Sequence, residues 1–128
     1  MNVTADTNVL VRAVMGDDKR QSKIAQAELA KAAVVAIALP ALCEFVRVLS
    51  HGYKVPAVDI AKTIRVLCNS SNVAVNRQAV EAGLAMLETG GDFADGAIAF
   101  EGRVLGGNRF ISFDRQVVKR LGDHARLL

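Results

Sequence analysis

Acidic side chains follow, or lie close to, short apolar segments at three places in this sequence. Asp6 closes the first such segment, Asp114 follows the segment 110–113, and Asp95 lies at the start of a predicted helix. Carboxylates that are packed together repel one another unless protons or a cation neutralise them. Oxygen ligands suit Mg²⁺ or Mn²⁺ and disfavour zinc, and neither of the two histidines lies next to these acids in the sequence. Metal ions held by such a cluster would activate a water and neutralise charge on a phosphate, so we expect phosphodiester hydrolysis.

Each of these acids also has a purely structural interpretation. An Asp just before a helix is a good N-cap, which would account for Asp6 and Asp114. Asp92 could cap a helix that begins at Phe93, with Asp95 in the first turn, where the helix dipole favours an anion. Asp92 then remains a candidate for an outer or secondary metal ligand. The residue pattern alone leaves both interpretations open.

Two glutamates are harder to place. Glu44 lies nearly opposite the apolar stripe of its predicted helix, and it could be solvated with Arg47 as an ion-pair partner. That stripe consists of Leu42, Phe45, Val46 and Leu49. Glu101, in contrast, falls within the apolar stripe of a later helix, which predicts partial burial and leaves its role open. Helical geometry therefore gives Glu44 no special claim to a metal site.

The elements that must position these acids alternate between short strands and helices. Apolar runs predict strands at 2–6, 34–39, 73–75, 110–113 and 125–128, and helical spacing predicts helices at 9–15, 22–32, 40–50, 58–68, 78–88, 93–105 and 115–121. Pro40 suits the first turn of its helix, and the glycine pairs at 90–91 and 106–107 suit helix ends. This alternation predicts an α/β fold with a parallel sheet between helices, which binds ligands at the carboxyl ends of its strands.

Composition narrows the class of protein. The chain of 128 residues is 52% apolar and 23% charged, which predicts one globular domain over residues 1–128. No apolar run is long enough to span a bilayer and no secretory signal is evident, so a cytoplasmic protein with no membrane association is expected. In that compartment Cys43 and Cys68 are expected to be buried thiols rather than a disulfide. No phosphate-binding loop, dinucleotide motif, nucleophile elbow or zinc-protease motif is present.

Charge is unevenly distributed along the second half. Residues 78–102 hold five acidic and no basic residues, whereas residues 103–128 hold six basic and two acidic ones. Such a distribution suits a site that holds cations and attracts phosphates, although two differently solvated helix faces would also explain it. With no Trp and one Tyr, the chain has few stacking platforms. A nucleic acid would therefore be held mainly through its phosphates.

Four segments, taken in order, resemble the PIN-domain nucleases, and within them the VapC toxins of bacterial type II toxin–antitoxin systems. The resemblance covers nearly the whole chain and rests on segments 3–10, 42–49, 92–99 and 110–115. The first is similar to the family's opening strand and Asp-Thr-Asn turn, and the second to its helix with an acid. The third and fourth are similar to its remaining acidic motifs, the last being a strand that ends in an acid.

The resemblance implies a three-layer α/β/α fold with a four- to five-stranded parallel sheet. It also implies an acidic pocket around Mg²⁺ or Mn²⁺, supported by hydrogen bonds from Asn8 and Ser112. The acids of that pocket are Asp6, Glu44, Asp95 and Asp114. Ser112 stands where the family often has Thr, and Gly96, where a bulkier residue is more usual, would weaken the start of its helix. The implied function is a hydrolase, a toxin endoribonuclease that is homodimeric and inhibited by a cognate antitoxin protein.

Two other functions fit the sequence. One is a nuclease without a toxin role, acting in RNA processing or on DNA. The other is a protein-binding module in which the acids only cap helices. A metal-binding pocket should gain thermal stability from Mg²⁺ or Mn²⁺, whereas helix caps need no metal.

Overall fold

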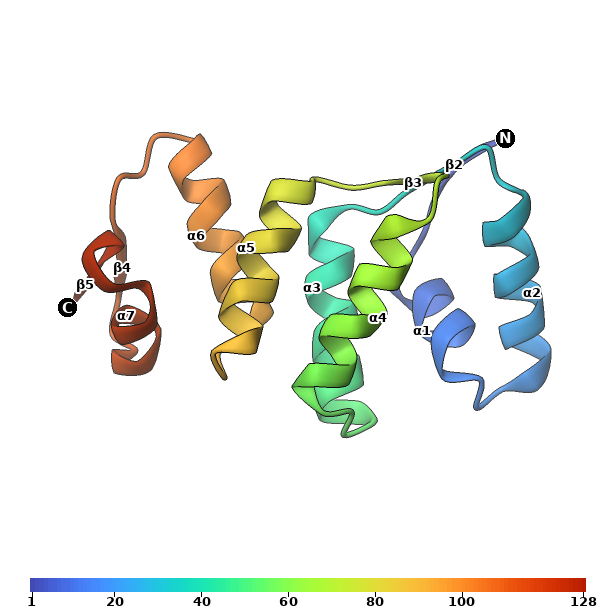
Figure 1. Ribbon diagram of the computed structural model, residues 1–128, viewed down its shortest axis with the longest axis horizontal. Coiled ribbons are helices and arrows are strands. Elements are labelled where there is room, and N and C mark those ends of the chain that lie inside the picture. The colour runs from blue at the N-terminus through green and yellow to red at the C-terminus, as the bar shows by residue number, and fades with distance from the viewer. The chain divides into compact units, whose positions relative to one another are not determined.

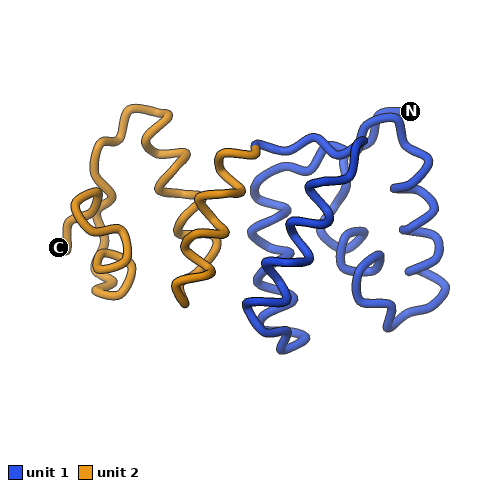
Figure 2. Tube along the Cα trace, viewed as in Figure 1, with its two compact units in different colours: residues 1–76 blue, residues 77–128 orange.

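The computed structural model describes all of residues 1–128, which form two compact units, residues 1–76 and residues 77–128 (Figures 1 and 2). The first unit contains β1 (Asn2–Thr4), α1 (Thr7–Met15), α2 (Lys19–Lys31), β2 (Val34–Ala36), α3 (Leu39–Arg47), the π-helix η1 (Val48–Gly52), α4 (Ala57–Asn69) and β3 (Val73–Ala74). The second contains α5 (Arg77–Glu88), α6 (Phe93–Val104), β4 (Phe110–Ser112), α7 (Arg115–Leu121), the 3-10 helix η2 (Gly122–His124) and β5 (Ala125–Leu127).

In the first unit, a three-stranded parallel sheet has the order β1-β2-β3. The central strand places Val35 opposite Val3 on one side and Val73 on the other, and Val35 is almost fully buried. Helix α1 packs against both α2 and α3. Each strand is followed by helical segments before the next parallel strand, as parallel pairing requires.

The core of the first unit comes from helix faces with regular apolar spacing. In α4, Ile60, Ile64 and Cys68 recur every four residues and are all buried. In α3 the buried side chains are Leu42, Phe45 and Val46, as the sequence pattern predicts. Fully burying a Leu or Phe side chain stabilises the fold by about 1.5–3 kcal/mol.

In the second unit, α5 and α6 approach closely because glycines lie at their contact. A Cβ on Gly96 would overlap the main-chain carbonyl of Ala82, and a Cβ on Gly83 would come within 2.6 Å of the ring of Phe93. Phe93 is completely buried. The prediction that Gly96 merely weakens its helix was therefore incomplete, because this glycine permits the α5–α6 contact.

The strands β4 and β5 form a separate parallel pair, with Phe110 opposite Ala125 and Ser112 opposite Leu127. Helix α7 connects them and packs against both. All strand pairs in the chain are thus parallel, three strands in one sheet and two in the other. This arrangement confirms the α/β class and is consistent with a three-layer α/β/α fold. The five parallel strands are divided between two sheets, however, and do not form the single four- to five-stranded sheet that the resemblance implies.

Some details differ from the sequence predictions. The helix that begins near Pro40 passes into a π-helix at Val48 rather than ending as a regular helix at residue 50. Glu101 is exposed, so its predicted partial burial was wrong. The face of α6 that packs is built from small residues and Phe93, whereas Ile98 is 56% exposed.

Neither cysteine forms a disulfide, which agrees with the sequence prediction, and Cys68 is buried whereas Cys43 is partly buried. No helix combines the length and the apolar character that crossing a membrane would need.

Candidate active site

Asp6 lies two residues beyond the end of β1 and is the N-cap of α1. Its Oδ1 accepts a hydrogen bond of 2.7 Å from the backbone N–H of Thr7. The side chain is exposed, and Oδ2 makes no hydrogen bond in the protein. Capping therefore occupies one carboxylate oxygen and leaves the other available to a ligand.

Thr7 fixes the position of this turn. Thr7 is only 8% exposed, and its Oγ1 donates a hydrogen bond of 3.1 Å to the carbonyl of Ala41. The bond joins the first turn of α1 to α3. Glu44 lies three residues after Ala41, and residues with that spacing share one side of a helix. In the sequence, Thr7 carries only a weak signal, its position between an N-cap acid and an apolar helix.

Glu44 is exposed on α3 and makes no ion pair with Arg47. The apolar face of α3 turns into the core, so the carboxylate of Glu44 remains in solvent. Glu44 therefore lacks the ion pair with Arg47 that its position in the sequence allowed. Asn8 is also exposed, and its predicted supporting hydrogen bond stays a prediction.

In the second unit, Asp92 and Asp114 cap successive helices. Asp92 accepts a hydrogen bond of 3.1 Å from the N–H of Ala94 at the start of α6. Asp114 caps α7 through Oδ1, which accepts hydrogen bonds of 2.9 and 3.3 Å from the N–H groups of Gln116 and Val117. The cap interpretation is correct for both residues. In Asp114, as in Asp6, Oδ2 has no partner in the protein.

Asp95 differs from the other acids because it caps nothing. Its side chain is partly buried and makes no hydrogen bond. Burial raises its pKa, and the negative charges of Asp92 and Asp114 raise it further. These three carboxylates are thus electrostatically coupled, and Asp95 carries the cost of their repulsion.

Ser112 holds the backbone at this cluster. Its Oγ accepts a hydrogen bond of 2.9 Å from the N–H of Asp114, which immediately precedes α7. The hydroxyl therefore helps to fix the turn that carries the Asp114 carboxylate. Such local side-chain bonds are typical of Ser and Thr at helix starts.

The four predicted ligands fall into two pairs. Asp6 and Glu44 belong to the first unit, and Asp95 and Asp114 belong to the second. No group of three His, Cys, Asp or Glu side chains is arranged to hold a metal ion. The chemistry of the donors nevertheless fits a hard divalent cation, since all are carboxylates and the charge around Asp95 is uncompensated.

The family model described as "PIN domain" matches residues 3–123, which include all four acids and extend over both units. A comparison with curated proteins found no match. PIN domains are generally nucleases that use divalent metal ions and bind nucleic acid, so the match indicates a hydrolase of this kind. Because the match covers nearly the whole length, the chain belongs to the PIN domain family.

Proposed function

We propose that this protein is a Mg²⁺- or Mn²⁺-dependent endoribonuclease and the toxin of a type II toxin–antitoxin pair. The observation that carries the nuclease proposal is Asp95, a partly buried carboxylate with no hydrogen bond and with two acidic neighbours. A carboxylate that only stabilised the fold would not be placed where burial and like charges both oppose its ionisation.

The residues that would hold the metal are Asp6, Glu44, Asp95 and Asp114. When bound, the metal would supply a more acidic water and charge neutralisation at the phosphate. Asp6 and Asp114 would each bind through the oxygen that capping leaves free. Thr7 and Ser112 would hold the backbone of these two acids in place, and Asp92 would act from the outer shell.

The alternative, a binding module whose acids are only caps, has one observation in its favour. Asp6, Asp92 and Asp114 all accept hydrogen bonds from backbone N–H groups. Asp95 does not, and its position therefore separates the two proposals.

A cleavage assay with a matched control tests the nuclease. Asp59 occupies the third position of α4 as Asp95 occupies the third position of α6, so Asp59→Asn reproduces the charge loss at an unrelated helix start. Purified wild-type protein and Asp59→Asn should cleave structured RNA with Mg²⁺ or Mn²⁺ and lose activity with chelator. Asp95→Asn should lose at least about 100-fold, corresponding to roughly 2.7 kcal/mol of transition-state stabilisation. Equal cleavage by the two variants would show that Asp95 has only a structural role. A parallel assay with DNA completes the test, and cleavage of DNA but not RNA would favour the DNA nuclease.

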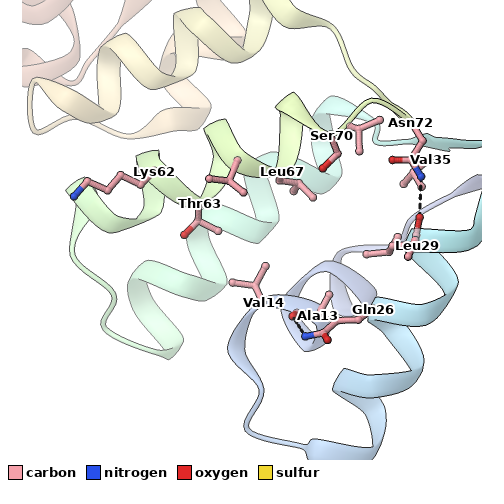
Figure 3. Close-up of a pocket in the computed structure, with 13 residues that line it drawn as sticks. Ala13, Val14, Gln26, Leu29, Val35, Lys62, Thr63, Leu67, Ser70 and Asn72 are labelled. Carbon is pink, nitrogen blue, oxygen red and sulfur yellow. Dashed lines mark hydrogen bonds between the residues drawn. The ribbon is translucent and has the colours of Figure 1, made fainter.

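An apolar pocket in the first unit supports the antitoxin as a partner. It has a volume of about 590 Å³ and lies among α1, α2, α4 and the neighbouring strands (Figure 3). Gln26 and Asn72 already donate hydrogen bonds to the carbonyls of Ala13 and Leu29, so they leave mainly apolar surface for a partner (Figure 3). Val66, which lines the pocket, is 73% exposed.

The charges beside the pocket indicate the chemistry of its occupant. Lys62 lines the pocket, and α2, which forms one of its walls, carries Lys19, Arg20, Lys23 and Lys31 along its length, of which Lys31 pairs with Glu28. An apolar pocket with a lysine in its lining and a basic helix as one wall fits an amphipathic, acidic segment. We assign it to the cognate antitoxin, and the homodimer implied by the resemblance stays a prediction.

Expression in bacteria tests the toxin role. Growth should stop when the chain is produced and should recover when a small antitoxin, encoded upstream of its gene, is produced with it. Val66→Glu should prevent recovery without reducing toxicity, whereas Val58→Glu, also exposed on α4 but outside the pocket, should not. Unaffected growth, with RNA cleavage intact in the purified protein, would favour an RNA-processing enzyme instead.

A further inference from the structure

A second cavity, of about 250 Å³, lies among α5, α6 and α7 of the second unit. Its wall includes the small residues Ala82, Ala85, Gly96 and Ala99. Two arginines, Arg103 from α6 and Arg120 from α7, also line it. No acidic side chain is among the lining residues.

The side chain of Arg120 reaches the end of α5. Its Nε donates a hydrogen bond of 3.4 Å to the carbonyl of Thr89. A Cβ on Gly91 would come within 2.9 Å of its Cδ, so the glycine turn leaves room for this side chain. The four N–H groups on the two terminal nitrogens make no bond within the protein. This single, long hydrogen bond leaves most donors of the guanidinium unused, and the side chain of Arg120 is exposed.

Arg103, in the last turn of α6, makes no ion pair or hydrogen bond through its side chain. Two cations therefore line one small cavity without a carboxylate to neutralise them. Arginine presents its donors in a planar fork that suits the oxygens of a phosphate. An anion in this cavity would meet donors from both arginines.

The cavity has a fixed relation to the acidic cluster of the second unit, which consists of Asp92, Asp95 and Asp114. Helix α6 carries Asp95 in its first turn and Arg103 in its last, a rise of about 12 Å at 1.5 Å per residue. Helix α7 follows Asp114 and carries Arg120 in its last turn, a rise of about 9 Å. Both helices are therefore acidic at the start and basic at the end. An RNA strand that ran from one end of these helices to the other would therefore place different phosphates at the two ends.

We propose that Arg103 and Arg120 bind a backbone phosphate of the RNA strand other than the phosphate at the acidic cluster. This inference rests on the proposed function, because it takes the acidic cluster as the place of cleavage. It assigns the arginines to substrate binding and strand placement, not to the chemical step.

RNA binding in the presence of chelator tests the inference separately from cleavage. The full-length protein is titrated into fluorescently labelled single-stranded RNAs of two and twelve nucleotides, at several salt concentrations. For the longer RNA, Arg103→Gln and Arg120→Gln should each raise Kd about tenfold and reduce the slope of log Kd against log salt by roughly one. The dinucleotide has a single phosphodiester and can occupy only one of the two ends, so it should bind every variant more weakly than the longer RNA does.

Lys119→Gln is the matched control, since it removes a neighbouring charge on α7 that does not line the cavity. We expect it to change Kd by less than about twofold. If Arg120→Gln lowers the melting temperature, the Kd of Arg103→Gln still tests the inference, because Arg103 makes no side-chain bond that the fold would lose. Binding by both arginine variants equal to that of Lys119→Gln, or no RNA binding by the wild type, would overturn the inference. Intact, arginine-dependent binding without any cleavage would support it and reject the nuclease proposal.

Discussion

Replacing Asp95 with Asn should stabilise the protein when metal is absent. Burial and the charges of Asp92 and Asp114 raise the pKa of Asp95, so its ionised form opposes folding. Like charges one helical turn apart, as in Asp92 and Asp95, cost about 0.2–0.5 kcal/mol. A similar contribution from Asp114 brings the expected gain to about 0.5–1 kcal/mol. For a chain of 128 residues, this corresponds to a rise of about 2–4 °C in Tm.

The pH dependence of this gain follows from the direction of the pKa shift. Below the ordinary Asp pKa of 3.8, the carboxyl is protonated in both folded and unfolded chains, and the penalty is absent. As pH rises through the raised pKa of the folded protein, the penalty develops fully. The stability difference between Asp95→Asn and wild type should therefore be near zero at low pH and largest at neutral pH.

Urea unfolding with chelator, measured over this pH range, provides the assay. Asp59→Asn is the reference, because it loses the same favourable interaction with a helix N-terminus without relieving a cluster. Adding Mn²⁺ should reverse the order, since the metal stabilises only a protein that binds it. An Asp95→Asn variant that is no more stable than Asp59→Asn at neutral pH would refute the repulsion argument.

Two further predictions concern the packing and the buried hydroxyl. Gly96→Ala should lower stability by about 1–3 kcal/mol because its Cβ meets the Ala82 carbonyl. Gly102→Ala, on the same helix but with open space around it, should instead stabilise by up to about 1 kcal/mol. Thermal unfolding compares the two variants, and equal effects would contradict the close contact at Gly96. Thr7→Val should cost about 1–3 kcal/mol because the Ala41 carbonyl loses its donor, and Thr7→Ser should retain most of that stability. Equal denaturation midpoints for Thr7→Val and Thr7→Ser would show that the hydroxyl does not hold α1 to α3.

Local sequence patterns were sufficient to predict the order and type of nearly all elements. Pro40, for example, predicts the start of α3, and Gly90 with Gly91 predicts the end of α5, because proline and glycine act on the backbone locally. The π-helix after α3 carries no such signal. The contact at Gly96 was not predictable either, since it depends on which residue of α5 lies opposite.

The candidate site was predictable in its residues but not in their surroundings. The cap roles of Asp92 and Asp114 follow from their positions before helices, and the structure has both. The coupling of Asp95 to Asp114 could not be predicted, because 19 positions in the sequence separate them and only tertiary structure brings their charges into interaction. The bond from Thr7 to Ala41 is equally non-local.

Calorimetric titration with Mn²⁺ tests most directly the central claim that Asp6, Glu44, Asp95 and Asp114 serve one metal-dependent site. The wild-type protein and the control Asp59→Asn should bind with the same affinity. Glu44→Gln and Asp95→Asn should each weaken binding at least about tenfold, and neither residue makes a side-chain bond that the fold would lose. Wild-type affinity in both of these variants would contradict the claim.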